Sequence, residues 1–530
     1  MSDAASPAAP ADAPGAAAPG PAPLTGVNLG ITAFALAIGT FMQVLDTTIA
    51  NVSIPTIAGD LGASVSQGAW VITAFAVANG VGVPLTGWLM QRFGVVRTFV
   101  VSVLLFTLMS FLCGIAWSLP SLVFFRILQG AVSGPLIPGS QALLMMIFGK
   151  ERQATGLAIW SMTTLVAPIC GPLLGGYISD NMHWSWIFLI NVPIGLACAF
   201  LCWRGLSSRE TPTRKLPVDT TGFALLVIWV GALQIMLDTG AEADWLSSPV
   251  IVAEMLIAVI GCAAWIIWEL TAKHPIVNLS LFRNRNFMIG AILLSVFYAV
   301  FFGNAVLLPL WLQTQLGYIA TWAGLVAAPS GLVAVLLTPL VARLLKTIGP
   351  RMIATISFVF LALSLFMRAG HPPDPSFSEL VWPSLALGVA MSGFFISMLT
   401  ISMSEIAPDK VPAASGLINF VRITVGSFAA ALVTTMWDNA AALHQTRIAE
   451  ETGAITDPRW AEAIRVLQEQ GASLAQATGA MVQRAVEQAL YIGALDLFSL
   501  SAWIVVVLLP IVWFARRVTP DPGAPPPAMD

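Results

Sequence analysis

Residues 28–52 read NLGITAFALAIGTFMQVLDTTIANV, an apolar run with a single charge, Asp46. A helix needs about 20 mostly apolar residues to cross the hydrocarbon core of a bilayer, so this segment predicts a membrane-spanning helix. Similar runs recur along the chain, in which 57% of the residues are hydrophobic and 10% are charged. Soluble domains carry roughly 25% charged residues. We therefore expect an all-α integral membrane protein.

Charge clusters and Gly/Pro turns divide the sequence into fourteen such runs. The positive-inside rule tests this count, because a cytoplasmic N-terminus places seventeen of the 24 Lys and Arg residues in cytoplasmic connections. An odd number of spans would break that alternation. We predict fourteen transmembrane helices with both termini in the cytoplasm, at approximately 28–52, 68–90, 98–118, 120–147, 151–178, 185–203, 218–240, 249–270, 286–312, 320–344, 350–369, 381–404, 412–437 and 493–515.

A short internal repeat in the sequence suggests how the helices are grouped. Pro84 is followed ten residues later by Gly94 in the second connection, and Pro339 is followed by Gly349 in the tenth. Transporter halves are often structural repeats, so we expect a 6+2+6 division of the helices. It consists of an N-terminal six-helix bundle (28–215), two inserted helices (216–272) and a C-terminal six-helix bundle (273–437 and 493–517).

Three segments fit none of the spans. Residues 1–27 are rich in Ala and Pro and lack the basic residues of a cleavable signal peptide, so we expect a disordered cytoplasmic tail there and another at 518–530. Residues 438–492 are too polar for a span and too long for a turn, but they have helical patterning. We interpret them as a long periplasmic loop that either caps the protein's own mouth or docks a partner, and the sequence leaves these alternatives even.

The sequence offers little for catalysis or metal binding. The five cysteines lie in apolar runs and form no C-x-x-C pair, and no H-E-x-x-H motif occurs. The Gly149-Lys150 pair lacks the upstream glycine of a phosphate loop. We expect no enzyme, no ATP-driven pump, no metal, no nucleic-acid partner and no cofactor beyond a coupling proton.

Asp46 and Arg126 are the most informative charges, because ionisable groups inside spans are costly and usually pair or line aqueous cavities. Each lies about six residues from the outer end of its span, roughly 9 Å deep, so the two are predicted to meet. Burial favours the neutral form of a carboxyl group and a nearby arginine favours the ionised form. The pair is thus either a proton-coupling site or a permanent structural ion pair.

Four segments together carry a family signature: LDTTIANVSIP (45–55), GWLMQRFGVVR (87–97), RILQGAVSG (126–134) and APICGPLLGG (167–176). They resemble the motifs of the major facilitator superfamily, and more narrowly those of its fourteen-helix drug:proton antiporters of the EmrB type. The segments WIFLINVPIG (186–195), LQIMLD (233–238) and SLFRNRNF (280–287) extend this resemblance along nearly the whole chain. One departure is Gln91, which stands where the family motif has an acidic residue.

The resemblance implies gate and antiporter residues, namely Gly87, Arg92, Gly94, Arg97, Pro168, Gly171, Pro172, Gly175 and Gly176. Small residues allow close helix approach, and prolines within a span kink it. We expect Gly175 and Gly176 in particular to form a close helix contact. The alternatives are that the arginines serve only membrane orientation and that the glycines serve only packing.

These observations predict a proton-coupled exporter of small hydrophobic compounds that works by alternating access in a bacterial inner membrane. The resemblance also implies a periplasmic adaptor of the membrane-fusion type and an outer-membrane channel. A dedicated exporter of one metabolite and a non-transporting sensor or scaffold are the alternatives. The substrate cavity is expected to be apolar and aromatic, with candidate lining residues Trp160, Met162, Phe302, Asn304, Trp311, Asn419, Phe420 and Arg422.

Overall fold

The structure, a computed structural model, describes residues 24–215, 217–241, 243–451 and 458–516, and within the helices a few side chains, that of Pro172 among them, lie outside the description. All regular elements in these ranges are helical. The tail expected at 518–530 and nearly all of the tail expected at 1–27 lie outside the described residues. The first described helix begins at Gly26.

The helices follow the apolar runs of the sequence. The first part of the chain contains α1 (Gly26–Asp60), α2 (Val65–Gly82), α3 (Thr86–Phe93), α4 (Val95–Gly114), α5 (Leu119–Ser133), α6 (Leu136–Asn181), α7 (Trp186–Leu189) and α8 (Asn191–Leu206). The two inserted helices are α9 (Thr220–Thr239) and α10 (Pro249–Thr271). The last part contains α11 (Arg285–Gln315), α12 (Ala320–Ile348), α13 (Pro350–Ala369), α14 (Phe377–Met403), α15 (Val411–Glu451), α16 (Pro458–Glu469), α17 (Leu474–Leu508) and a terminal 3₁₀ turn, η6 (Leu509–Phe514).

Short polar motifs set where several helices begin. Ser64, Ser118, Ser376 and Ser473 each form a reciprocal capping box with the side chain three residues later, at the starts of α2, α5, α14 and α17. Such a box satisfies backbone N–H groups that a helix leaves without partners in its first turn. These caps define where the four apolar helices begin.

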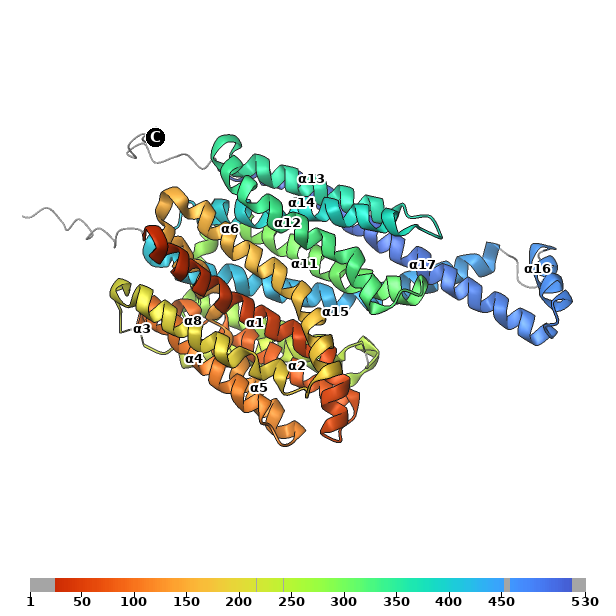
Figure 1. Cartoon of the computed structure of the whole chain (residues 1–530), viewed down its shortest axis with the longest axis horizontal. Coiled ribbons are helices and arrows are strands. Elements are labelled where there is room, and N and C mark those ends of the chain that lie inside the picture. The colour runs from red at the N-terminus through yellow and green to blue at the C-terminus, as the bar shows by residue number, and fades with distance from the viewer. Residues whose placement is uncertain (1–23, 216, 242, 452–457, 517–530) are drawn as a thin grey trace, which may run out of the picture.

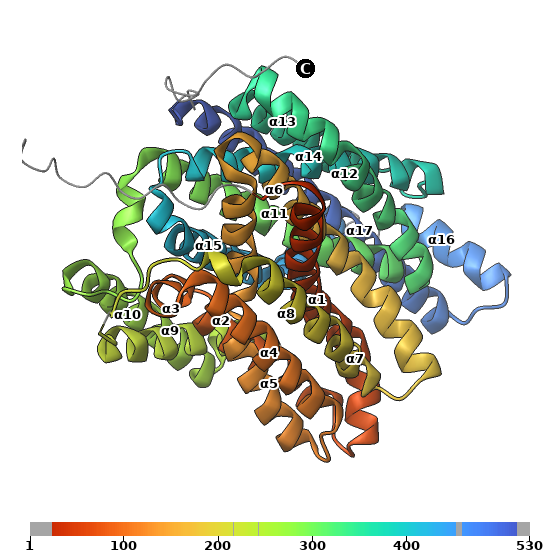
Figure 2. The same cartoon turned by 60° about the vertical axis from the view of Figure 1, so that its left-hand side comes forward.

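The helices form two bundles that lie side by side (Figures 1 and 2). In the first bundle, α1 packs against α6, α2 against α5, and α4 against α8. In the second, α11 packs against α15, and α14 lies between α12 and α13. The inserted α9 and α10 pack together on the outside, where α9 reaches both α2 and α15. The two bundles and the pair α9 and α10 are compatible with a 6+2+6 grouping, which stays a prediction as long as the number of spans does.

Twelve described helices are long and apolar enough to span a membrane, and a thirteenth arises if α2 and α3, which are bent by 56°, count as one span. The predicted span at 151–178 corresponds to the arm of α6 that follows Gly149, where positive φ breaks the helix; several side chains of this arm lie outside the description. The count of fourteen therefore stays a prediction. The start of α1 and the end of η6 lie at the same end of the molecule (Figure 1), as an even number of spans requires.

The glycines of the internal repeat have the same backbone conformation in the structure. Gly94 has φ 95° and ψ 152° before α4, and Gly349 has φ 79° and ψ 158° before α13. A positive φ strains any residue with a side chain, so glycine is the residue suited to both turns. The prolines differ, because Pro84 lies in the bend between α2 and α3, whereas Pro339 lies inside an unbroken α12.

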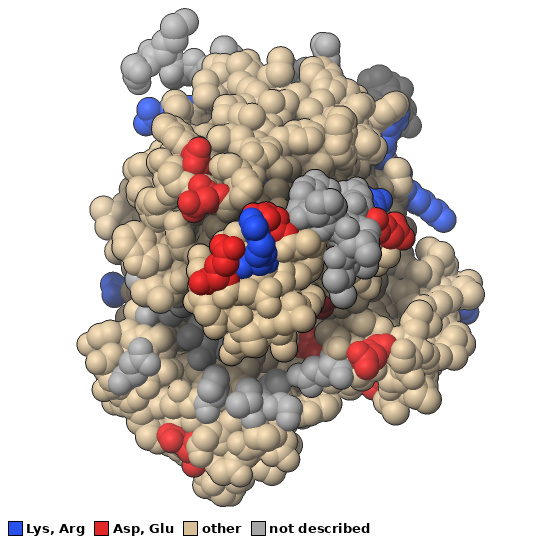
Figure 3. All heavy atoms as spheres, turned by 90° about the vertical axis from the view of Figure 1, so that its right-hand side faces the viewer, with Lys and Arg blue, Asp and Glu red and all other residues tan. Residues whose placement is uncertain are grey.

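Residues 438–492 differ from the expected loop in their boundaries. Helix α15 continues to Glu451 and α17 already begins at Leu474, with α16 between them. The stretch is rich in Ala, Gln and Glu, which favour helices, so the spans simply extend beyond the predicted membrane limits. The resulting projection lies at the end of the molecule opposite the start of α1 and the end of η6 (Figure 1). Seen from that end, acidic side chains are spread over the face while most basic ones lie at its edge (Figure 3).

Candidate functional site

The ion pair predicted between Asp46 and Arg126 is present in the first bundle. Arg126 Nη1 lies 2.6 Å from Asp46 Oδ2, and both side chains are completely buried. Removing two charges from water costs several kcal/mol per ion unless their partners are well placed. The surroundings of the pair must therefore supply further hydrogen bonds.

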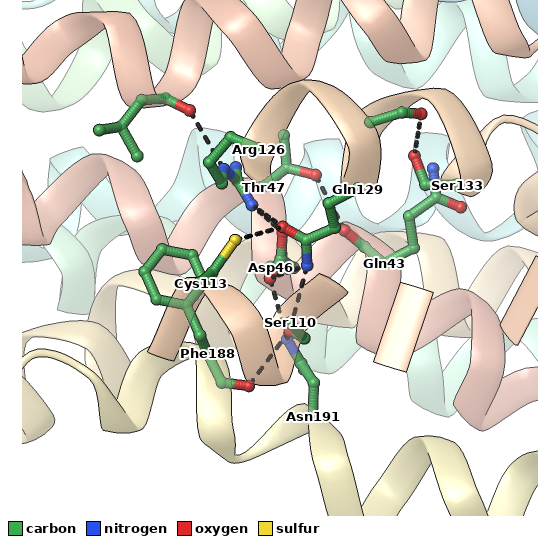
Figure 4. A network of polar contacts seen from close by, with 12 residues as sticks. Gln43, Asp46, Thr47, Ser110, Cys113, Arg126, Gln129, Ser133, Phe188 and Asn191 are labelled. Atoms are coloured by element: carbon green, nitrogen blue, oxygen red, sulfur yellow. Dashed lines mark hydrogen bonds and ion pairs between the residues drawn. The ribbon is translucent and has the colours of Figure 1, made fainter. Parts of the chain in front are cut away.

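Neutral side chains from three other positions complete this coupling network, which we define as Asp46, Ser110, Arg126, Gln129 and Asn191 (Figure 4). Asn191 Nδ2 donates to Asp46 Oδ1 at 2.9 Å, and Gln129 Nε2 donates to the same oxygen at 3.3 Å. Arg126 also donates to Gln129 Oε1 at 2.7 Å. Ser110 accepts from both amides. Helices α1, α4, α5 and α8 thus all contribute to one polar group.

The arginine has a fixed position. Its Nε donates to the carbonyl of Val71 at 3.1 Å, and its guanidinium lies 4.1 Å from the ring centroid of Phe75 and 5.4 Å from that of Phe188. Cation–π contacts of this kind are worth most when water is excluded. The cation is therefore held by α2 and α7 even when its interaction with Asp46 changes.

Two atoms of the network lack partners among the described groups: Arg126 Nη2 and Asn191 Oδ1. A buried network that is only partly satisfied is costly, and unsatisfied groups of this kind often mark functional sites. The buried network around Asp46 and Arg126 is therefore a candidate functional site.

The antiporter glycines lie directly beside this network. A Cβ atom at Gly175 would approach the carbonyl oxygen of Ile49 to 2.8 Å, and one at Gly171 would overlap Thr48. Thr48 and Ile49 follow Asp46 on α1 by two and three residues. The contact expected for Gly176 is not seen, since no described atom beyond its own stretch of helix lies within 4 Å of its Cβ position. Helix periodicity explains the correction, because neighbouring residues on a helix point about 100° apart.

The pair Gly175 and Gly176 offers a matched test of this interface. Gly175→Leu is expected to force α1 and α6 apart and to lower the free energy of unfolding by about 1–3 kcal/mol, with slower transport. Gly176→Leu should leave both properties near the wild-type values. Thermal unfolding and transport of the two purified variants measure this difference. Equal destabilisation by both leucines would contradict the assigned contact.

The segment 87–97 makes two kinds of contact, one with the second bundle and one with the connection that follows the first bundle. A Cβ atom at Gly87 would come within 2.6 Å of Cα of Ala413 at the start of α15. Glu210 accepts backbone hydrogen bonds from Val96 and Arg97 at 3.0 and 2.8 Å, where an acidic group stabilises a helix N-terminus. The carboxylate at this turn therefore comes from Glu210, which is distant in sequence. Position 91, where the family motif has an acidic residue, is glutamine. Whether the turn acts as a gate stays a prediction.

The expected cavity residues separate into groups. Trp160, Asn419 and Arg422 lie together, because Arg422 donates to Asn419 Oδ1 at 2.7 Å and lies 5.7 Å from the Trp160 ring. Phe302 adjoins them through Tyr298, with ring centroids 4.3 Å apart. The bundles meet at this group, so it has the position that a substrate site requires.

The other cavity candidates make contacts outside this group, and their place in a substrate cavity stays a prediction. Trp311 is fully buried in an aromatic cluster inside the second bundle, and Phe420 packs against the tryptophans of α9 and α10. Asn304 donates to a carbonyl of its own helix and to a hydroxyl of α17. Met162 is half-buried on the second arm of α6. Sequence position places a residue along a helix but does not fix the direction in which it points when all faces are apolar.

Sequence reasoning missed Ser110, Gln129 and Asn191. A usable signal existed, because each is a polar residue inside an apolar run, and Gln129 follows Arg126 by three residues and so shares its helix face. Gln141, which contacts Asn419, was missed for the same reason. No group of three His, Cys, Asp or Glu residues in the described part of the chain is placed to hold a metal ion.

A membrane protein of two helical bundles with a buried ion pair in one of them has the architecture of a secondary transporter. The family model of the Major Facilitator Superfamily matches residues 36–431. The chain is 47% identical over 495 residues to the multidrug export protein EmrB of Escherichia coli K12, covering 93% of this chain and 96% of that protein. It is 44% identical over 494 residues to the fatty acid resistance protein FarB of Neisseria gonorrhoeae, covering 93% and 97%.

A crystal structure of the human organic anion transporter MFSD10 (TETRAN) has a similar fold, with a TM-score of 0.54, 12% identity and coverage of 91% of this chain and 99% of that one. The chain belongs to the Major Facilitator Superfamily, and within it to the EmrB-type multidrug exporters. It is a multi-pass transporter of the bacterial inner membrane, not an enzyme.

Proposed function

We propose that this exporter is a proton-coupled antiporter that expels hydrophobic drugs and toxic compounds by alternating access between its two bundles. The observation that carries the proposal is the coupling network around Asp46. A proton that enters along the membrane potential supplies about 2.3 kcal/mol per 100 mV, and it needs a buried group that can take it up and release it. Asp46 is that group in the first bundle.

In this mechanism, protonation of Asp46 removes its negative charge and weakens the pair with Arg126. The arginine remains held by Val71 and Phe75, so the change falls mainly on α1. Thr48 and Ile49 on α1 contact Gly171 and Gly175 of α6. A shift of α1 therefore reaches α6, the helix whose two arms also contact α12, α14 and α15 of the second bundle.

The contacts between the bundles support alternating access. Ala158 of α6 packs in one apolar cluster with Ala342 and Leu345 of α12, and Gly87 contacts Ala413. These contacts are made by small or aliphatic side chains, which separate at little electrostatic cost. If the termini are cytoplasmic, as proposed, the basic connection at 87–97 also lies on that side, and we propose that these contacts close the cytoplasmic entrance.

The protein is proposed to act as the inner-membrane part of a tripartite pump, with a periplasmic adaptor and an outer-membrane channel as partners. The projection formed by the ends of α15 and α17 with α16 supports this, because it carries exposed apolar side chains such as Leu443, Val466 and Leu474. Exposed apolar groups beyond the bilayer favour a protein partner over water. The alternative, a dedicated exporter, is supported by the similarity to the fatty acid resistance protein FarB.

Transport by purified protein in liposomes tests the proposal. An imposed pH gradient is expected to drive several chemically unrelated hydrophobic compounds across the membrane, and a protonophore should stop their movement. A dedicated exporter would move one chemical class only. Transport that is unaffected by the pH gradient, or no transport of any compound by well-folded protein, would contradict proton-coupled export.

A further inference from the structure

A second buried arginine lies where the bundles meet, and it has no carboxylate partner. Arg422 on α15 is 2% exposed, and no acidic side chain in the described part of the chain lies within ion-pair distance of it. Its guanidinium is instead surrounded by the rings of Tyr298, Trp160 and Phe395, at 4.3, 5.7 and 5.8 Å. A buried charge without a counter-ion is costly, so this position invites an explanation.

Arg422 belongs to a hydrogen-bonded chain that crosses from one bundle to the other. Its Nη2 donates to Asn419 Oδ1 at 2.7 Å, and Asn419 Nδ2 donates to Gln141 Oε1 at 2.7 Å. Gln141 lies on the first arm of α6, in the first bundle. We call Gln141, Asn419 and Arg422 the interbundle cluster, and anything that binds all three residues contacts both halves of the protein.

Two donor groups of the interbundle cluster have no acceptor among the described residues. Arg422 Nε and Gln141 Nε2 are buried and have no hydrogen-bond partner among the described residues, and the hydroxyl of nearby Ser415 finds none there either. Asn419 already donates to the Ser415 carbonyl at 2.8 Å. A guanidinium and an amide that each keep a donor nitrogen without an acceptor are best satisfied by an anion, because charge-assisted hydrogen bonds are about twice as strong as neutral ones.

The comparison with Arg126 sharpens the point. Arg126 has the carboxylate of Asp46 at 2.6 Å, so the protein itself supplies an anion to that arginine. Arg422 is equally buried, but among the described side chains it finds a neutral amide where Arg126 finds a carboxylate. The first bundle thus contains a carboxylate for its buried arginine, whereas the described part of the interbundle cluster contains none.

We infer that the interbundle cluster binds the acidic group of an amphipathic substrate, a carboxylate or phenolate, while the apolar part of that substrate lies against Tyr298 and Phe395. This inference rests on the proposed function and names a substrate class for it. The substrate anion supplies the counter-charge that Arg422 lacks. Gln141 donates to the second oxygen of a carboxylate or to the single oxygen of a phenolate. Cationic compounds gain nothing at this position, because Arg422 repels them.

Binding to residues of both bundles links occupancy to their relative position. When the bundles separate on one side, Gln141 and Arg422 move with different halves, and a bound anion loses one of its two anchors. Substrate release therefore accompanies the change of access. A site within a single bundle does not have this property.

The test uses purified full-length protein and three probes of equal chain length: decanoate, methyl decanoate and decyltrimethylammonium. Isothermal titration calorimetry is expected to show that the wild type binds decanoate more tightly than the neutral ester. Arg422→Gln should weaken decanoate binding about tenfold to a hundredfold, the loss expected for one hydrogen-bonded charge. Binding of the ester should change less than twofold, and binding of the cation should become tighter.

Asn419→Asp provides a second variant of the same size, which keeps the arginine and places a carboxylate beside it. It should exclude decanoate to a similar extent because Arg422 is then neutralised internally, and it decides the matter if Arg422→Gln fails to fold. The matched control is Arg368→Gln on α13. Arg368 is also buried, but it lies within the second bundle beside Ser384 and Phe498, so its loss should not affect the preference for decanoate.

The inference is overturned if the wild type binds the ester as tightly as decanoate, if the Arg422 and Asn419 variants keep the wild-type affinity for decanoate, or if Arg368→Gln removes the preference equally. The proposed function fails separately, when a pH gradient drives none of the three probes out of liposomes that contain wild-type protein. A pump that exports the cation but shows no preference for decanoate would leave proton-coupled export standing and contradict only the anion site.

Discussion

Asp46→Asn is expected to abolish proton-driven export while the helices still insert and drug binding largely persists. Asparagine has nearly the size of aspartate, and its amide oxygen can still accept from Arg126, whereas its NH2 group takes the place of the oxygen that accepts from Asn191. Asparagine binds and releases no proton at this position. Loss of one partner of a buried ion pair destabilises a protein by about 3–5 kcal/mol when the other charge is left alone. Here the retained oxygen and the Phe75 ring reduce that cost.

Export per molecule, measured in liposomes at equal protein content, separates the two interpretations of the pair. A coupling carboxylate predicts complete loss of proton-driven transport. A structural ion pair predicts a lower protein level with normal turnover per molecule. The matched control is Asp496→Asn, which removes a carboxylate on α17, outside the first bundle, that lies 2.7 Å from His444 of α15. This variant should transport normally.

Replacement of residues 447–472, the tip of the projection, is expected to leave the transporter folded and active in liposomes but unable to export across a two-membrane envelope. A Gly/Ser linker of the same length keeps the contacts at the base, where Trp437 donates to the Leu490 carbonyl at 2.7 Å and His444 contacts Asp496. The tip should thus be separable from the fold. Drug resistance of intact cells and transport in liposomes are the two measurements.

A control for this replacement preserves the helix and changes only its surface charge. Glu462 and Arg465 of α16 form an ion pair at 2.6 Å, and exposed pairs contribute little to stability. Alanine at both positions should leave the fold intact and thus shows whether these charges take part in docking. If the linker variant fails to insert, or if it protects intact cells as well as the wild type does, the tip is not a docking segment.

The architecture was largely predictable from the sequence, because membrane spans depend on local composition. The apolar runs around Asp46 and Arg126 predicted two helices, and their depths predicted that the charges would meet, as they do at 2.6 Å. The turn glycines Gly94 and Gly349 were also recognisable, because their spacing after a proline repeats. Each of these inferences needs only the position of a residue along its own helix.

The lateral arrangement was not predictable, because it depends on which face of each helix meets a neighbour. Gly175 contacts α1 and Gly176 does not, although both belong to one motif. Trp311 and Trp160 are both fully buried, yet only Trp160 lies beside Arg422. A helix that is apolar on all sides has no stripe to indicate its orientation, so tertiary packing alone determines these contacts.

The ends of α15 and α17 show a related limit. Hydropathy locates where a helix leaves the membrane, but not where the helix itself ends. Residues 438–451 and 474–492 remain helical because their composition favours helix in water as well. A polar stretch was therefore predicted as a loop with helical character, whereas the structure extends both spans into it.

Drug-induced proton release from purified protein in detergent tests the central claim most directly. Wild-type protein is expected to release protons when a transported drug is added, since drug and proton compete for states of the same carrier. Asp46→Asn should bind the drug and release no protons from this site, while Asp496→Asn should behave as the wild type. Equal proton release from Asp46→Asn and wild type would contradict the account, because the coupling carboxylate would then have to lie elsewhere in the protein.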